Sequence, residues 1–263
     1  MRLFIYLFTV SILLLSCEEV IQLDLDSMET KYVIEADLNN LSAEQSIRIS
    51  QSVAFDEEVN AKPVTNAVVF VSDSRGRLFK FDYNPEAQRY INSNFAAQEH
   101  LIYRLKVTIG DNEFSAQAKM PSYVPVDSIR IAEDKILKDT YYSIVMKFND
   151  PAGVENYYKY DISINQNPFK FISVFSDKYN DGLNVSHTIT NRKNTIAYGD
   201  EVLVRRQCIE KATYTFWQEV QKANPGNAAP TNPVSNISNG ALGYFSVSSA
   251  MDYNVKISMD SLN

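Results

Sequence analysis

Much of the chain alternates between apolar and polar residues with a period of two. This is the pattern of a strand with one face in the core and the other in solvent. The clearest case is residues 103–109, in which the odd positions are apolar and the even positions are Arg, Lys and Thr. Residues 110–112, Gly-Asp-Asn, then lead into a second alternating stretch at residues 114–118. This arrangement predicts a β-hairpin.

Shorter segments of the same kind precede the hairpin and are separated by turn-forming residues. They are residues 32–38, 46–53, 67–71, 78–83 and 90–92. Together with the hairpin they make about seven strands, spaced as in a β-sandwich. We therefore assign an immunoglobulin-like or transthyretin-like β-sandwich to residues 29–120.

Residues 121–125, Pro-Ser-Tyr-Val-Pro, are the best linker candidate, because two prolines block a helix and remove backbone donors. Strand alternation resumes after them, and we assign a second antiparallel β domain to residues 126–263. It carries the alternating stretches 142–148, 158–164 and 253–257.

One part of this second domain has a different period. From Ile209 to Ala223 the apolar residues recur every three or four positions, and Asn-Pro-Gly at 224–226 ends the run. This predicts one helix near residues 209–224. We expect its apolar stripe to cover the second sheet.

The first 16 residues have the plan of a signal peptide. Arg2 is followed by an apolar stretch over residues 3–15, which is shorter than the roughly 20 residues that cross a membrane. The junction Leu-Leu-Ser-Cys at 14–17 resembles the bacterial lipobox, in which the cysteine is acylated and becomes the new N-terminus. We expect a leader over residues 1–16, lipid attachment at Cys17 and a lipidated tether over residues 17–28. The alternatives are an ordinary secretory signal or a short anchor that is not cleaved.

Two acidic residues, Glu18 and Glu19, follow this cysteine. They resemble the export signal that sends lipoproteins to the cell surface of Bacteroidota, although they could simply keep the tether solvated. The first interpretation predicts an outer-membrane, lipid-anchored protein that is exposed at the cell surface.

The charge balance argues against nucleic-acid binding. The chain has 25 Lys+Arg and 32 Asp+Glu, a net charge of −7, which becomes −8 when Arg2 leaves with the leader. The basic residues do not cluster, and phosphate neutralisation needs clustered cations. Besides Cys17 the only cysteine is Cys208, which lies in a strand-like stretch and is expected to be a buried, inert thiol.

The sequence shows no pattern of catalytic residues or metal ligands. The only histidines, His100 and His187, are far apart and are expected at the surface or in turns. Residues 177–182, Asp-Lys-Tyr-Asn-Asp-Gly, resemble a calcium loop. However, Tyr179 stands at the third position of such a loop and Thr188 at the twelfth, where carboxylates are needed. We therefore predict a polar β-turn and no metal, cofactor or catalytic residue.

Two further groups of residues could bind or carry sugars. A set of tyrosines could stack on a sugar or hold a peptide, although tyrosine at strand spacing is more often core or sheet surface: Tyr141, Tyr142, Tyr157, Tyr158 and Tyr160. Three serines lie in Asp-Ser-apolar tripeptides that resemble Bacteroidota O-glycosylation acceptors: Ser27, Ser128 and Ser261.

Several motifs resemble a Bacteroidota outer-membrane lipoprotein family, domain of unknown function 4249. They are the acidic start after Cys17, KYVIE at 31–35, FNDPAG at 148–153 with NYY at 156–158, and PVSNISNGALGYF at 233–245. The resemblance implies a surface-exposed lipoprotein that is often encoded beside a TonB-dependent transporter, with no established catalytic residues. We expect Gly240 and Gly243 to permit tight turns before a strand.

These observations favour a non-catalytic accessory or substrate-binding lipoprotein that works with a TonB-dependent transporter. A structural or adhesive surface protein is the alternative from another class. A hydrolase is less favoured, and its candidate groups would be carboxylates such as Asp150 or Asp181.

Overall fold

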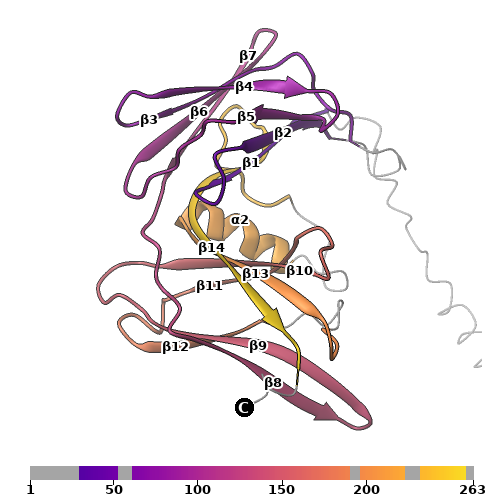
Figure 1. The fold of residues 1–263 in the computed structure, drawn as a ribbon. Coiled ribbons are helices and arrows are strands. Elements are labelled where there is room, and N and C mark those ends of the chain that lie inside the picture. Colours follow the sequence, from indigo (N-terminus) through magenta and orange to yellow (C-terminus); the bar gives the residue numbers. More distant parts are fainter. Residues whose placement is uncertain (1–29, 53–60, 190–195, 223–231, 259–263) are drawn as a thin grey trace, which may run out of the picture.

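The structure is a computed structural model, which describes residues 30–52, 61–189, 196–222 and 232–258 (Figure 1). These residues are mainly β, in one large and one small sheet, with one helix among them. The predicted fold class, mainly β with large antiparallel sheets and one helix, is therefore confirmed. Several residues singled out from the sequence lie outside the described ranges: Cys17, Glu18, Glu19, Ser27 and Ser261.

The first half contains seven strands. They are β1 (Tyr32–Asn39), β2 (Gln45–Gln51), β3 (Val68–Asp73), β4 (Leu78–Asn84), β5 (Arg89–Asn92), β6 (Ile102–Ile109) and β7 (Asn112–Lys119). The second half contains β8 (Ser128–Ile136), β9 (Asp139–Asn149), β10 (Tyr157–Ile164), β11 (Lys170–Ser176), β12 (Asn184–Ile189), β13 (Glu201–Ile209), α2 (Lys211–Lys222) and β14 (Leu242–Lys256).

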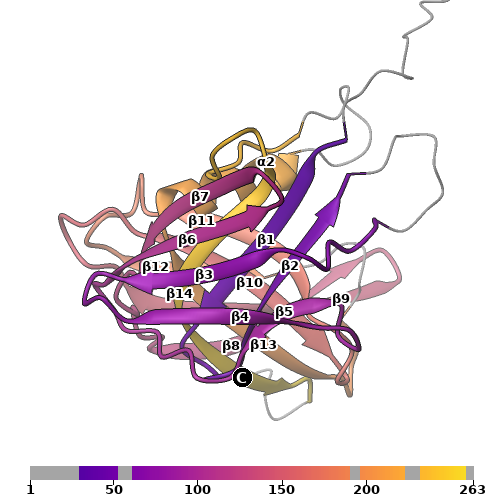
Figure 2. The same cartoon turned by 90° about the horizontal axis from the view of Figure 1, so that it is seen from above.

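The strands of the first half fold over a common apolar core. Their order in the sheet is β1-β2-β5-β4-β3-β6-β7, and β3 and β4 lie across β1 and β2 in the view from above (Figure 2). β6 and β7 form the predicted hairpin, in which Leu105 and Val107 are buried while Arg104 and Lys106 are exposed. The alternation in the sequence thus separates the core face from the solvent face.

The last strand, β14, connects the two halves. Its first part pairs in parallel with β1, from Val33↔Leu242 to Asn39↔Ser248. Its second part pairs antiparallel with β13, from Cys208↔Ser249 to Glu201↔Lys256. Consequently Phe245 and Val247 pack in the first core, whereas Val255 packs in the second. The C-terminal segment, which the sequence assigned wholly to residues 126–263, contributes to both cores because one strand completes both parts of the sheet.

The second half is layered around β10, which is buried on both faces. Tyr158 and Tyr160 face the small sheet of order β12-β9-β8 and share a core with it, while Lys159 faces the ring of Trp217 on α2. Figure 1 shows the helix between the strands of the first half above it and β10, β11 and β13 below it. The ring centroids of Trp217 and Phe171 of β11 are 4.3 Å apart. The helix therefore covers β10 and β11, the strands of the second half that belong to the large sheet, which agrees with the predicted role of its apolar stripe.

A buried ion group lies where the two halves meet. The Lys159 ammonium is 2.5 Å from the Asp161 carboxylate, 3.2 Å from that of Asp37 on β1 and 2.9 Å from the Gln207 amide oxygen. Burial by itself lowers the pKa of Lys159, but the two carboxylates outweigh it and raise the pKa above its usual value. The lysine stays charged, and it ties β1 to β10 and β13.

Substitution of Gly243 tests the contact between β14 and β1. A Cβ on Gly243 would lie 2.1 Å from the Ile34 carbonyl oxygen, and the residue has a φ of +93°. This glycine thus serves close approach inside β14 rather than the turn expected before it. We expect Gly243→Ala to lower the free energy of unfolding by more than about 3 kcal/mol, from clash and backbone strain together, in urea denaturation.

Gly240→Ala is the matched control. Gly240 also has a positive φ, +70°, but a Cβ there meets nothing within 4 Å. We expect this variant to lose only about 1 kcal/mol. Equal losses in the two variants would show that β14 does not need close contact with β1.

Candidate functional site

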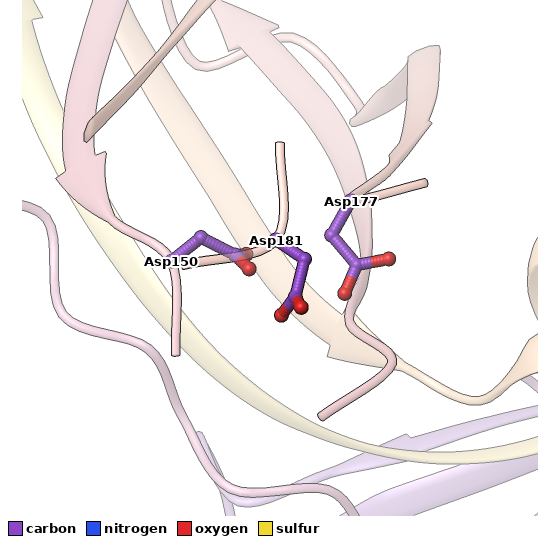
Figure 3. A group of neighbouring side chains, drawn as sticks. All are labelled: Asp150, Asp177 and Asp181. Atoms are coloured by element: carbon purple, nitrogen blue, oxygen red, sulfur yellow. The ribbon is translucent and has the colours of Figure 1, made fainter. Parts of the chain in front are cut away.

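Three carboxylates from two loops meet beside the end of β9. Asp150 follows β9, while Asp177 and Asp181 lie in the loop between β11 and β12. One oxygen from each lies within 4.8 Å of those of the other two, and Figure 3 shows the three side chains converging. Asp150 and Asp177 are buried and Asp181 is exposed. Among the described residues, none of these carboxylates forms a salt bridge with a lysine or arginine.

Hydrogen bonds hold each carboxylate by one oxygen. Asp150 Oδ1 accepts from the Tyr158 hydroxyl at 2.5 Å, and Asp177 Oδ2 accepts from the backbone N–H of Asn156 at 2.7 Å. Asp181 Oδ1 accepts from the Gly153 N–H, also at 2.7 Å. The loop of residues 150–156 is therefore pinned to the loop of residues 177–183 by the carboxylates themselves.

Asp150 has an unusual environment for an acid. Only 5% of its surface is exposed, and its Oδ2 atom is buried without a hydrogen-bond partner. Burial raises the pKa of Asp150, and the nearby charges of Asp177 and Asp181 raise it further, while hydrogen bonds from the Tyr158 hydroxyl and the Gly182 backbone N–H oppose this. The site therefore favours either a proton or a cation at this oxygen.

Close contact between the two loops depends on a glycine. Gly182 has a φ of +71°, and a Cβ at this position would lie 2.8 Å from the Cβ of Ala152. A side chain would push the loops apart, so the carboxylates are held together by backbone packing as well as by hydrogen bonds.

A recess of about 630 Å³ adjoins this acidic cluster. Its walls come from the same two loops and from one face of α2. The lining includes Glu155, Tyr157, Asp177, Asp181, Lys211 and Tyr214. It presents aromatic rings, carboxylates and an ammonium group together, which are groups that can orient a polar ligand.

The aromatic wall of the recess is built from two tyrosines. The rings of Tyr157 and Tyr214 are 4.9 Å apart, and the Tyr157 hydroxyl donates to Glu155 at 2.9 Å. Burial and then this carboxylate raise the pKa of Tyr157 to about 12, so the phenol stays neutral. Lys211 lies 3.4 Å from the same carboxylate.

The structure separates the tyrosines that the sequence grouped. Tyr157 lines the recess, but Tyr158 and Tyr160 are fully buried in the core and cannot stack on a ligand. Tyr141 is exposed on β9 and Tyr142 beside it is half-buried, away from the recess. Sequence reasoning missed Tyr214, because the helical period marks only which face is apolar.

The remaining candidates have mixed outcomes. Cys208 is a free, buried thiol, as predicted. Residues 177–182 form a turn, as predicted, with the Asn180 N–H donating to the Asp177 carbonyl. Ser128 is exposed at the start of β8. The prediction for His187 is wrong, because it lies inside the second core with 4% of its surface exposed, whereas His100 is exposed.

Comparison with known proteins identifies the family. The model of a domain of unknown function, DUF4249, matches residues 18–254. The chain belongs to the DUF4249 family. No curated protein matches it significantly.

Among solved structures, a two-domain fibronectin type III segment of chicken tenascin is similar at 8% identity. The similarity covers 87% of this chain and 99% of that one, with a TM-score of 0.24. Similarity at this level supports no conclusion about function. Within the described residues of this DUF4249 chain, no helix has the length and apolar character needed to cross a membrane.

The buried His187 predicts a pH dependence of stability. Burial, and then the charge of Arg206, lowers the pKa of His187 to about 3 from 6.5. Below pH 6.5 the unfolded chain therefore binds a proton that the folded chain does not. The free energy of unfolding consequently decreases as the pH is lowered. We expect the His187 contribution to fall by about 1.4 kcal/mol per pH unit, or about 2 kcal/mol between pH 6.5 and 5.

Urea denaturation of three proteins at these two pH values checks this prediction. His187→Gln should remove the His187 contribution to the pH dependence, because Gln does not titrate. Gln also keeps a polar group beside the Tyr160 hydroxyl, which lies 2.9 Å from His187 Nδ1 in the wild type. His100→Gln should leave it unchanged. An unaltered pH dependence in His187→Gln would mean that another group is responsible.

Proposed function

We propose that this chain is a lipid-anchored, non-catalytic accessory protein of a TonB-dependent outer-membrane transporter. In this proposal Cys17 carries the lipid, Glu18 and Glu19 direct export to the cell surface, and the recess beside α2 holds a polar substrate of the transporter. The recess is the observation that carries the binding role.

The chemistry of the recess supports a ligand rich in hydroxyl groups. Tyr157 and Tyr214 offer aromatic surface, and Glu155, Asp177 and Lys211 offer charged hydrogen-bonding groups around it. Sites of this size commonly bury most of a small ligand while a few polar groups fix its orientation.

The geometry gives less support to a hydrolase based on Asp150 and Asp181. A glycosidase needs two carboxylates that flank the bond to be cleaved. Asp150 is buried, accepts a hydrogen bond from Tyr158 and is not part of the lining of the recess. Asp181 does line the recess, and in the proposed role it contacts the ligand without cleaving it.

The anchor is tested by substitution of Cys17. Several acyl chains hold a protein on a membrane stably, at about 0.8 kcal/mol per buried CH2. We expect the wild-type protein to fractionate with outer membranes and to lack residues 1–16 by mass spectrometry. Cys17→Ala should lose the acyl mass and leave the membrane fraction. Membrane retention of the variant would contradict lipid anchoring.

The binding role is tested by purification of the full-length protein from its own cells in mild detergent. We expect a stoichiometric transporter in the preparation, and native mass spectrometry should show a bound small molecule. Tyr214→Ala should weaken binding of this molecule roughly tenfold through lost stacking and contact area.

The matched control is Arg104→Ala. Arg104 is exposed on β6 in the first half, whereas the recess lies in the second half. It should retain both the transporter and the small molecule. A protein recovered alone that adheres to surfaces would instead favour the structural or adhesive role. Release of a cleaved ligand would favour a hydrolase.

A further inference from the structure

We propose that Asp150, Asp177 and Asp181 bind a calcium ion, which clamps the loop of residues 150–156 to the loop of residues 177–183 beside the recess. One loop supplies Asp150 and the other supplies the remaining two carboxylates. The ion would therefore bridge segments that are separate in the sequence.

The spacing of the oxygens suits calcium. Calcium lies 2.3–2.6 Å from its oxygen ligands, so two ligand atoms of one ion can be about 5 Å apart. One oxygen of each of the three carboxylates lies within 4.8 Å of the others, which meets this limit. Magnesium requires a tighter octahedron and keeps more of its water, so it fits less well.

The environment of one atom points independently to a ligand. Asp150 is 95% buried, since 5% of its surface is exposed, and its Oδ2 atom has no hydrogen-bond partner. A buried carboxylate oxygen without a donor is costly, and such atoms are rare in folded proteins. This oxygen belongs to a side chain that points into the acidic cluster (Figure 3). A cation there would supply the missing partner.

Within the described part of the chain, the cluster is not neutralised by ion pairs with basic side chains. No described lysine or arginine forms an ion pair with any of the three carboxylates, and the nearest lysine in sequence, Lys178, lies over the ring of Tyr179. The exposed position of Asp181 leaves one side of the cluster open to water, which commonly completes the coordination of calcium.

The proposal deepens the proposed function, because Asp177 and Asp181 also line the recess. A fixed pair of loops would give the recess a fixed shape. Cation binding is measured on the purified protein, whereas the accessory role is measured by the partner and ligand recovered from cells. A failure of the calcium proposal can therefore be distinguished from a failure of the accessory role.

The experiment uses full-length protein in detergent, treated with a chelator and then titrated with calcium chloride. We expect the unfolding temperature to rise with millimolar calcium, with a Kd of about 10⁻⁴ to 10⁻³ M, as in other extracellular modules. Terbium should give luminescence excited through Tyr158, whose hydroxyl lies 2.5 Å from Asp150 Oδ1. Calcium should displace terbium.

Asn substitutions remove the charge of a carboxylate but keep its shape. The amide oxygen can still accept the hydrogen bond that the carboxylate accepts in the wild type. Asp150→Asn and Asp181→Asn should each weaken calcium binding at least about tenfold. Asp111→Asn, in the exposed turn between β6 and β7, should bind as the wild type does. This control separates the site from the general effect of lost negative charge.

Three results would overturn the proposal. The first is a wild-type protein whose unfolding temperature and terbium luminescence do not respond to either ion. If Asp150→Asn is then as stable as the wild type, a proton holds the buried oxygen instead. The second is unchanged calcium affinity in Asp181→Asn, and the third is an equal response to magnesium, which would overturn the assignment to calcium.

Discussion

The structure depends on the two pairings made by β14. A parallel partner at one end and an antiparallel partner at the other make this strand part of both halves. Because each backbone N–H and C=O in a buried sheet needs a partner, the first half cannot complete its sheet without residues more than 200 positions away. Lys159 lies beside this junction and attracts Asp37 of β1 and Asp161 of β10. Removal of one partner from such a buried group leaves an unpaired charge, so the group specifies how the halves meet.

A second buried cation organises the core behind the site. Arg206 is fully buried and forms no salt bridge with a described carboxylate. Its guanidinium lies 4.4 Å from the ring centroid of Phe148 and 4.5 Å from that of Tyr158, and it donates to the Val124 carbonyl. The aromatic faces and carbonyl replace water around the charge. Tyr158 is therefore held from one side by the arginine while its hydroxyl holds Asp150 from the other.

This chain of contacts connects the stability of the core with the geometry of the site. Asp150 is fixed by a core tyrosine, and Asp177 and Asp181 are fixed by the backbone of the neighbouring loop. A ligand or ion at the cluster would therefore meet groups that are already in place and need little ordering. The recess shares two of these residues, so the same loops serve both features.

The sequence by itself determined the mainly-β class, the hairpin of β6 and β7, the helix and the buried state of Cys208, because each follows from local periodicity or residue type. It also placed Asp177 and Asp181 in one polar turn and named Asp150 and Asp181 as carboxylates of the less favoured hydrolase. Only the tertiary structure decided that they meet, that Tyr157 and Tyr214 share a recess, that His187 is buried and that β14 completes both halves. These outcomes depend on pairings between distant segments, and a period of two fixes which face of a strand is apolar without fixing its neighbour.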